Sequence, residues 1–342
     1  MGSAAMGDPA LMTRRERVLA SLRHESTDKL PYQLDLTEEV HARLAEYFGD
    51  DGFFEKTGSH LAIEHNESFT TMPNGRFKDM YGVTWNRQQE GDFGVVEHYL
   101  LTDAEFGDYV FPKPDEKLIR EKCERLVRDK NELFTLYAIG FSLFERAWTL
   151  RSMPELLMDF VVNPDFAHEL LDRIVEYNLA VMDIAFEYDI DAIFFGDDWG
   201  QQKGLIMGAP FWREFIKPRL RTMYSKAKDR GMYVCQHSCG DISAIFPDLI
   251  ELGLDIYNTF QPEIYDVEAA KKQCGDKLTF YGGISTQRLL PYAGPDEVKS
   301  TMKKLMGILG ADGGYIVAPT HAMPNDIPTE NILAFLDVVQ NQ

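Results

Sequence analysis

Cysteine is scarce in this sequence, which contains four among 342 residues: Cys123, Cys235, Cys239 and Cys274. Four cysteines so widely separated do not form the disulfide framework of a secreted domain, so we expect a reducing, cytoplasmic setting. Long hydrophobic runs are also absent, because no uncharged apolar stretch approaches the roughly 20 residues of a membrane span. No basic and apolar leader begins the chain either. The sequence therefore predicts neither a membrane protein nor a secreted one.

Basic residues are outnumbered, since 35 Lys and Arg against 55 Asp and Glu give a formal net charge of −20. Proteins that bind nucleic acid or anionic membranes rely on an excess of basic residues, so we expect neither partner. No G-x-G-x-x-G turn follows a strand-like run, which disfavours a dinucleotide-binding sheet. The first eleven residues, MGSAAMGDPAL, have the composition of a disordered leader, and we expect residues 12–342 to form one domain.

The C-terminal two thirds of the chain alternates short apolar runs with amphipathic helical stretches that begin at Pro and end at Gly. The apolar runs are nearly continuous, as in parallel strands covered on both faces. Eight strands followed by helices predict an α/β fold, a (β/α)8 TIM barrel with an N-terminal helical extension; a doubly wound sheet is the alternative. A β-hairpin insertion is predicted between Met80 and Val110. The strands are predicted within 29–36 and 59–69, and at 134–139, 191–195, 232–236, 254–258, 278–281 and 314–318.

Chemistry in such barrels lies where the strands end, and the segment QHSCGD follows the strand at 232–236. Side chains two residues apart on a strand point the same way, so Cys235, His237 and Cys239 share one side. An imidazole and a thiolate at one strand end are half of a zinc site. The alternative is a buried structural cysteine beside a hydrogen-bonded core histidine. A helix expected directly after Cys239 would lower the pKa of its thiol.

A zinc site needs a third ligand, and His321, at the end of the last predicted strand, is the best candidate. Cys274 precedes a strand and therefore lies at the opposite end of the barrel, while Cys123 belongs to a polar helix. The alternative for His321 is a loop residue that caps a turn. The fourth position is open, or is taken by a carboxylate.

Acidic side chains follow two other strands. Asp197 and Asp198 come after the strand at 191–195, and Glu145 lies among apolar residues in FSLFERAW. These three are candidate catalytic acids or bases. Their alternatives are a solvated loop for the aspartates and an internal salt bridge for the segment with Glu145 and Arg146, since an unpaired buried charge is costly.

Several segments together resemble the uroporphyrinogen decarboxylase superfamily. They are TRRERVLASLRHESTDKLPY, HSCGD followed by DLIELGLDIYNTFQPE, LTFYGGISTQ and GGYIVAPTH, so the resemblance runs from about Met12 to the C-terminus. The family fold is a (β/α)8 barrel. One branch decarboxylates a tetrapyrrole without a metal, and the other contains zinc methyltransferases that work with corrinoid proteins. A homodimer is common in the superfamily.

The residues favour the methyltransferase branch. The decarboxylase binds its polyanionic substrate with arginines near the first strand, where this chain has PYQLDLTEEV, with three acids and no arginine. The zinc branch carries H-x-C, matched by His237 and Cys239, and usually a distant cysteine, where this chain has His321. The resemblance therefore implies a zinc-dependent transfer of methyl between a small methylated substrate, a methyl ether being favoured, and the cobalamin of a corrinoid protein. The alternatives are a cofactor-free decarboxylase and a barrel without enzymatic activity.

Overall fold

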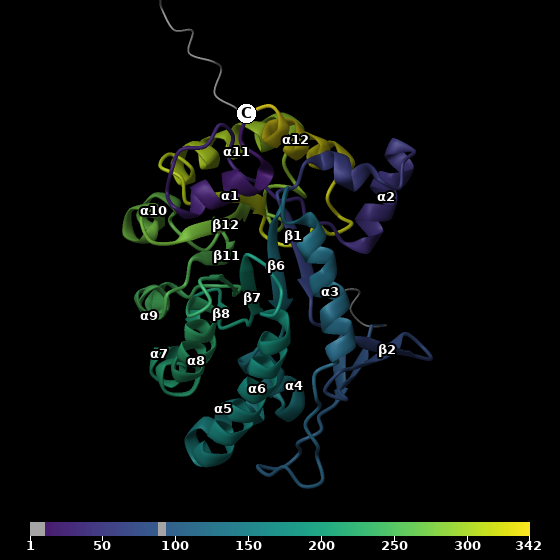
Figure 1. Ribbon diagram of the computed structural model, residues 1–342, viewed down its shortest axis with the longest axis vertical. Helices are drawn as coiled ribbons and strands as arrows, with labels where there is room; N and C mark the ends of the chain where they lie inside the picture. The colour runs from purple at the N-terminus through teal and green to yellow at the C-terminus, as the bar shows by residue number, and fades with distance from the viewer. Residues whose placement is uncertain (1–10, 88–93) are drawn as a thin grey trace, which may run out of the picture.

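The computed structural model describes residues 11–87 and 94–342, and a curved parallel sheet forms its centre (Figure 1). The sheet contains seven strands in the order β1, β6, β7, β10, β11, β12, β13. All residues of β6, β11, β12 and β13 are buried, as parallel strands require when helices cover them outside and other strands face them inside. The strands are Leu61–His65, Phe134–Ile139, Ala192–Gly196, Tyr233–His237, Ile256–Phe260, Thr279–Ile284 and Tyr315–Pro319.

Residues 31–36 close the sheet into a barrel. Tyr32 pairs in parallel with Val317 of β13, the last strand. On the other side, the amide of His60 donates to the carbonyl of Tyr32 at 2.9 Å, just before β1 begins. The predicted (β/α)8 barrel is therefore confirmed, although its first strand contributes isolated bridges rather than a continuous ladder.

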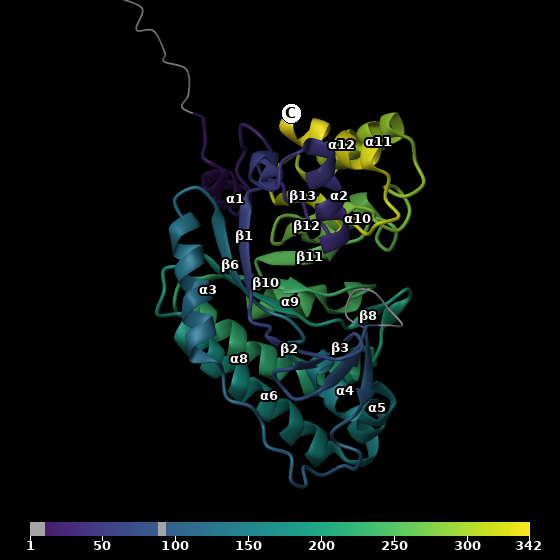
Figure 2. The ribbon, with the colours of Figure 1, turned by 90° about the vertical axis from the view of Figure 1, so that its right-hand side faces the viewer.

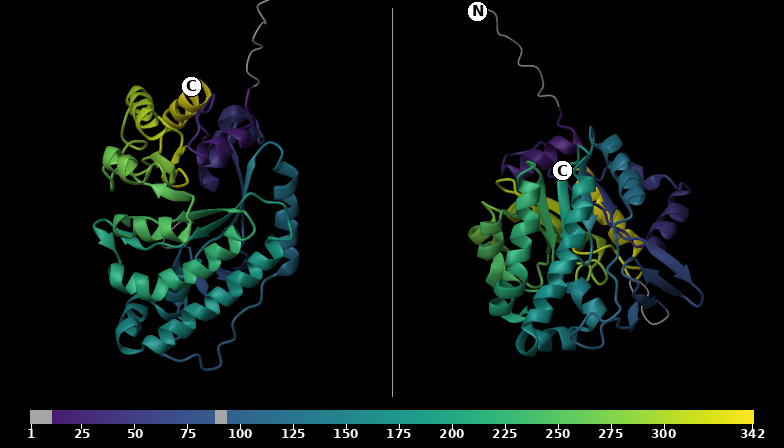
Figure 3. Two further views of the ribbon diagram at one scale, coloured as in Figure 1. Left: turned by 60° about the vertical axis from the view of Figure 1, so that its left-hand side comes forward. Right: turned by 60° about the horizontal axis from the view of Figure 1, so that its bottom comes forward.

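Helices follow the strands and return along the outside of the barrel (Figures 2 and 3). Five of them (α5, α6, α8, α9 and α11) have Pro in the first turn. Gly49 ends α2 and Gly253 ends α9, both in the left-handed conformation. No helix among the described residues is long and apolar enough to cross a bilayer. The helices are α1 (Arg14–Leu22), α2 (Glu38–Phe48), α3 (Glu116–Asp129), α4 (Phe144–Arg151), α5 (Met153–Val162), α6 (Pro164–Ala185), α7 (Gly208–Phe211), α8 (Lys217–Lys228), α9 (Phe246–Leu252), α10 (Val267–Cys274), α11 (Pro295–Leu309) and α12 (Thr329–Gln340).

The interior of the barrel is filled by apolar side chains. Val18 of α1 belongs to this interior cluster, so the N-terminal helix closes the end of the barrel at which the strands begin. This confirms the predicted helical extension. The other buried members are Leu61, Phe134, Leu136, Ala192, Cys235, Ile256, Tyr281, Ile316 and Ala318, contributed by every strand of the sheet. The opposite end, where the strands finish, is left for polar groups.

Between β1 and α3 the chain forms a separate antiparallel sheet at the rim of the barrel (Figure 2). Its strands are β2 (Phe69–Met72), β3 (Arg76–Asp79), β4 (Thr84–Asn86) and β5 (Val95–His98). The predicted insertion is present, but it begins earlier than Met80 and has four strands instead of a single hairpin. Residues 88–93 of that prediction lie outside the described residues. A buried ion pair of 2.6 Å between Asp79 and Arg146 fastens this sheet to α4.

The boundaries of the predicted strands need small corrections. β10 ends at His237, so this histidine belongs to the strand instead of the following loop. β12 continues to Ile284, so Gly282 and Gly283 lie inside it. His237, Gly282 and Gly283 therefore take part in the pairing of the parallel strands, because the backbone hydrogen bonds continue beyond the last apolar residue of each run.

Candidate metal centre

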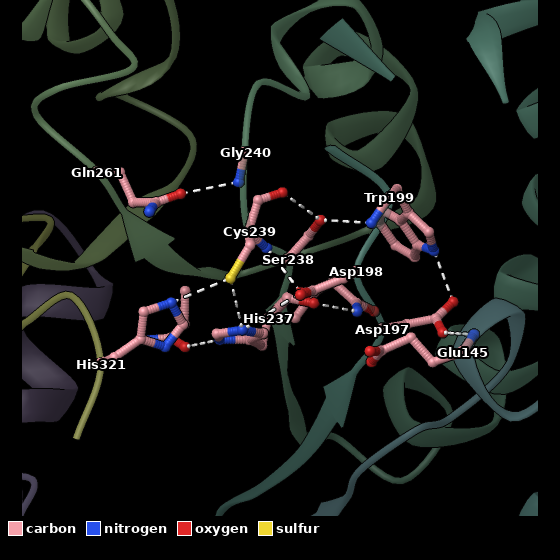
Figure 4. Close-up of polar contacts among 12 residues, drawn as sticks. Glu145, Asp197, Asp198, Trp199, His237, Ser238, Cys239, Gly240, Gln261 and His321 are labelled. Carbon is pink, nitrogen blue, oxygen red and sulfur yellow. Dashed lines mark hydrogen bonds and ion pairs between the residues drawn. The ribbon is translucent and has the colours of Figure 1, made fainter. Parts of the chain in front are cut away.

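The three residues that the sequence predicted as metal ligands meet at the end of the barrel where the strands finish (Figure 4). His237 ends β10, Cys239 follows two residues later, and His321 lies two residues beyond the end of β13. Cys235 belongs to the interior cluster, and His237 stands above it on the same side of β10. Residues 82 positions apart therefore meet because the barrel brings the ends of β10 and β13 to one rim.

The distances between the three donor atoms suit a tetrahedral zinc ion. Sγ of Cys239 is 3.5 Å from Nε2 of His237 and 3.1 Å from Nε2 of His321. Zn–S bonds of about 2.3 Å and Zn–N bonds of about 2.0–2.1 Å imply a separation of about 3.5 Å between sulfur and nitrogen. Within the described ranges, the possible ligand atoms of these three residues all lie within 4.8 Å of one another. Three protein ligands leave one position of a tetrahedron open, as in catalytic zinc sites.

The surroundings of the three ligands favour a positive charge at their centre. Burial opposes protonation of His237, but Cys239 and Asp198 beside it raise the pKa of its imidazole well above the ordinary value. Burial, assisted by the nearby His237, lowers the pKa of His321 to about 4, so this ring is neutral at pH 7 and has a lone pair to donate. A divalent cation held by these residues would take the place of the proton on His237, so the residues present fit zinc.

The prediction that a helix starts directly after Cys239 is wrong. A short 3-10 turn, Ser243–Ile245, comes first, and α9 begins at Phe246. Burial raises the pKa of the Cys239 thiol, although the adjacent His237 opposes the rise. The adjacent His237 therefore favours the thiolate form of Cys239, and no helix N-terminus contributes.

The loop that carries Cys239 is held from two sides. Oε1 of Gln261 accepts a hydrogen bond from the amide of Gly240 at 2.8 Å, and the hydroxyl of Tyr265 donates to the carbonyl of Gly240 at 2.7 Å. On the other side, Gly200 packs against the loop so closely that a Cβ there would lie 2.4 Å from the carbonyl oxygen of Cys239. These contacts fix the direction of the thiol before any metal arrives.

Asn258 was not among the predicted site residues, yet it contacts His237 directly. Its Oδ1 lies 2.5 Å from Nδ1 of His237, and the two residues are partners in the register of β10 and β11. Asn258 is the last residue of the strand predicted at 254–258, so it was counted as part of the strand and not as a functional residue. It could have been identified as a polar residue at a strand end, the criterion that identified His237.

Asp197 is fully buried and binds the first turn of α4. Its carboxylate accepts hydrogen bonds from the amides of Leu143, Phe144 and Glu145 at 3.3, 3.0 and 2.7 Å. The indole of Trp199 donates to it at 2.6 Å, so this fully buried tryptophan packs against the carboxylate. Burial raises the pKa of Asp197, and the four N–H donors oppose the rise. Asp197 therefore fixes the place from which Glu145 extends.

Asp198 and Glu145 lie on the His237 side of the centre (Figure 4). Oδ1 of Asp198 accepts a hydrogen bond from the amide of Cys239 at 2.8 Å and is 3.4 Å from Nε2 of His237. Burial opposes ionisation of Asp198, but the hydrogen bond and charge of His237 lower its pKa to about 2. Burial and the charges of Asp198 and Asp197 raise the pKa of Glu145 well above its ordinary value. The two neighbouring carboxyl groups therefore have pKa values shifted in opposite directions, downward for Asp198 and upward for Glu145.

Two glycines, Gly196 and Gly140, lie at the ends of β7 and β6, the strands on one side of β10 in the sheet. Gly196 ends β7 and pairs with His237 in the sheet register, and Gly140 follows β6, the next strand. A Cβ at Gly140 would lie 1.9 Å from Oε1 of Glu67, and a Cβ at Gly196 would contact the Cα of Gly140 at 3.4 Å. Glu67 was missed because the loop after β1 carries no motif. The absence of a side chain at Gly140 provides room for the carboxylate of Glu67.

Comparisons with known proteins agree with this fold. The model of the uroporphyrinogen decarboxylase (URO-D) family matches residues 79–342. A methylated-thiol–coenzyme M methyltransferase of Methanosarcina mazei is 22% identical over 174 residues, which are 51% of this chain and 44% of that protein. A uroporphyrinogen decarboxylase of Chloroherpeton thalassium is 22% identical over 183 residues, or 53% and 50% of the two chains. The matches thus span about half the length of these curated relatives.

A solved structure extends the similarity to the whole fold. A methyltransferase from Methanosarcina mazei superimposes with a TM-score of 0.71 and 16% identity, over 96% of this chain and 99% of that one. The shared architecture is therefore the barrel with its helices. Because relatives of both kinds match, the activity has to be argued from the site.

Proposed function

The chain belongs to the uroporphyrinogen decarboxylase family, and from this premise we propose that it is a zinc-dependent methyltransferase. In this proposal His237, Cys239 and His321 hold zinc, and a small methylated substrate gives its methyl group to a corrinoid carried by a partner protein. The observation that carries the proposal is the cluster of three donors with an open fourth position at the rim of the barrel. A relative whose name describes a methyltransferase supports it.

A methyl ether is the substrate class that the ligand set favours. When bound, zinc supplies Lewis acidity to the heteroatom that carries the methyl group. Cys239 contributes the one thiolate of the set, while His237 and His321 contribute neutral imidazoles. Thiolates donate more charge to a metal than imidazoles do, so this set leaves the zinc more positive than a set with two thiolates. A harder cation prefers an ether oxygen to a sulfur.

Glu145 is the proposed proton donor. As the bond between methyl and oxygen breaks, its electron pair stays on the oxygen, which takes the proton of Glu145. The methyl group passes to the reduced cobalt, with the electron pair of the new bond coming from the metal of the corrinoid. The raised pKa of Glu145 beside the ionised Asp198 supports this assignment, because neighbouring carboxyl groups with divergent pKa values are typical of acid–base sites.

The remaining acids have supporting roles in the proposal. Asp198 holds the amide of Cys239 and faces Nε2 of His237, so it keeps both ligands in place. Asp197 binds the first turn of α4 through three amides and thereby positions Glu145.

The test is methyl transfer to free cob(I)alamin from a panel of methyl ethers, thiols and amines, followed by the absorbance of methylcobalamin. We expect about one zinc per chain and activity with ethers. His237→Ala, Cys239→Ala and His321→Ala should lose zinc and activity, while Cys274→Ala, at the opposite end of the barrel, should keep both. Transfer from thiols alone would refute the ether preference. Full zinc occupancy with no transfer from any donor would refute the methyltransferase.

The decarboxylase alternative makes a different prediction, namely turnover of a porphyrinogen by zinc-free protein. The closing segment 31–36 places Asp35 where the hydroxyl of Tyr281 donates to it at 3.2 Å, inside the barrel. Asp35, Glu67 and Asp198 are acids near the rim, and a substrate with eight carboxylates would be repelled by them. Measured decarboxylation by metal-free protein would nevertheless replace the methyltransferase proposal.

A further inference from the structure

We infer that Asn258 is a positioning residue of the metal centre. Its amide oxygen fixes the ring of His237 with Nε2 toward Cys239 and His321, and its neutrality preserves the positive charge of the zinc. The inference rests on the proposed function for the identity of the metal, and it deepens that proposal by naming a residue that sets the preference for oxygen.

The orientation of the Asn258 amide follows from its second partner. Nδ2 lies 3.4 Å from the carbonyl oxygen of Tyr281, and a carbonyl can only accept a hydrogen bond. The nitrogen of the amide therefore faces Tyr281, and the oxygen faces Nδ1 of His237 at 2.5 Å. This amide oxygen can only accept, so Nδ1 of His237 carries the hydrogen. The other ring nitrogen, Nε2, is then the one with a lone pair for a metal.

Asn258 is itself well fixed. Its side chain is 8% exposed and bridges neighbouring strands, from His237 on β10 to the backbone of Tyr281 on β12. The register pairing of His237 with Asn258 places the two side chains side by side. The direction of the His237 ring is thus set by three adjacent strands of the barrel, which are more rigid than a loop.

The chemistry of Asn258 differs from that of a carboxylate in the same place. A metal-bound histidine often donates its second N–H to a carboxylate, which raises the basicity of the ring and the charge that it passes to the metal. An amide accepts the same hydrogen bond without a negative charge. Cys239 as the one thiolate and Asn258 as a neutral acceptor act in the same direction, and both leave the zinc more positive. Such a centre favours ether oxygen over sulfur.

The test uses full-length protein and two readouts besides activity: the zinc dissociation constant by chelator competition, and the visible spectrum of the Co²⁺-substituted protein. Asn258→Ala should weaken zinc binding about 10–100-fold and alter the Co²⁺ spectrum, as loss of an outer-shell partner does. Asn258→Asp should bind zinc at least as tightly as the wild type. It should also lower the ratio of methyl transfer from 4-methoxyphenol to transfer from a methyl thioether.

Asn331→Ala is the matched control. Asn331 in α12 is also buried and donates to the carbonyls of Leu290 and Ala293, away from the metal centre. Its loss should lower the melting temperature and leave zinc affinity unchanged, which separates the cost of removing any buried asparagine from a role at the metal.

Each outcome decides the inference. Wild-type zinc affinity and an unchanged Co²⁺ spectrum in Asn258→Ala would overturn the positioning role. An unchanged ratio of ether to thioether transfer in Asn258→Asp would overturn the role in substrate preference. Wild-type protein that binds no zinc would refute the proposed function, and this inference with it. Zinc binding by the wild type with no effect of either variant would refute the inference alone.

Discussion

The replacement of Glu145 by Gln tests the proposed acid. The side chain extends from the first turn of α4 toward Asp198 and His237 (Figure 4). Burial and the charges of Asp198 and Asp197 raise the pKa of Glu145 well above its ordinary value, which favours the protonated form that a general acid needs. Glutamine keeps the size of the side chain and its ability to donate a hydrogen bond, but it cannot transfer a proton.

The expected loss is that of general acid catalysis, about 10²–10⁴-fold in kcat, or about 2.7–5.5 kcal/mol of the barrier. The loss should depend on the leaving group. A phenol has a pKa of about 10, as tyrosine does, and leaves with partial negative charge more readily than an aliphatic alcohol. The effect of Glu145→Gln should therefore be smaller for an aryl methyl ether than for a dialkyl ether. KM should change little, because the hydrogen bond remains.

Initial rates of methylcobalamin formation at several pH values measure these effects. An acid must be protonated to act, so the wild-type rate should fall as pH rises through the raised pKa of Glu145, and the variant should lack that fall. Glu155→Gln is the matched control, since Glu155 is 59% exposed in the side chain at the start of α5. Equal losses for both kinds of ether, or loss of zinc from Glu145→Gln, would refute the reasoning.

Three further predictions concern the frame of the site. Asp79→Asn leaves the Arg146 side chain, 3% exposed, without a countercharge, and it should lower the free energy of unfolding in urea by about 3–5 kcal/mol. Glu97→Gln, in the more accessible ion pair with Arg76, should change it far less. Gly200→Ala inserts a methyl group 2.4 Å from the Cys239 carbonyl and should weaken zinc binding at least about tenfold, whereas Gly307→Ala, with nothing within 4 Å, should not. Burial, helped by Arg17 and Arg14, lowers the pKa of His60 to about 3, so between pH 6.5 and 3 the unfolded chain holds a proton that the folded chain lacks. His60 should therefore make the free energy of unfolding fall by about 1.4 kcal/mol for each pH unit below 6.5. His60→Gln should abolish this pH dependence, and His98→Gln, at an exposed position, should not change it. An unchanged pH dependence in His60→Gln would contradict the assignment.

Much of the barrel could be predicted because its signals are local. Continuous apolar runs identified the strands, and Pro and Gly marked the ends of the helices between them. The rule that functional groups follow strand ends then selected His237 and His321 from different parts of the chain. The structure brings these residues together with Cys239 because a closed barrel collects the ends of its strands at one rim.

Other parts depend on contacts that the sequence does not encode locally. The four strands of the insertion have three or four residues each and are largely polar. Such short segments do not show the alternation of apolar and polar residues by which a strand is recognised in a sequence. The first barrel strand pairs at isolated positions because residues 31–36 leave the ladder after each bridge. Asn258 contacts His237 through the register of the sheet, and Glu67 lies in the space beside Gly140. Both placements depend on tertiary contacts between distant segments of the chain.

The net charge of the proposed metal centre gives a reason for a neutral histidine, instead of a cysteine, at position 321 when Asp198 is nearby. A zinc ion held by the thiolate of Cys239 and two neutral imidazoles would carry one positive charge, and the ionised Asp198 beside Cys239 and His237 would neutralise it. A second thiolate at position 321 would leave a net negative charge in a buried site, and desolvation makes that expensive. In the proposed zinc centre, the neutral His321 would therefore allow both a carboxylate that holds the Cys239 loop and a cation positive enough to polarise an ether. In this proposal the absence of a second cysteine and the presence of Asp198 are linked, because together they keep the net charge of the buried centre near zero.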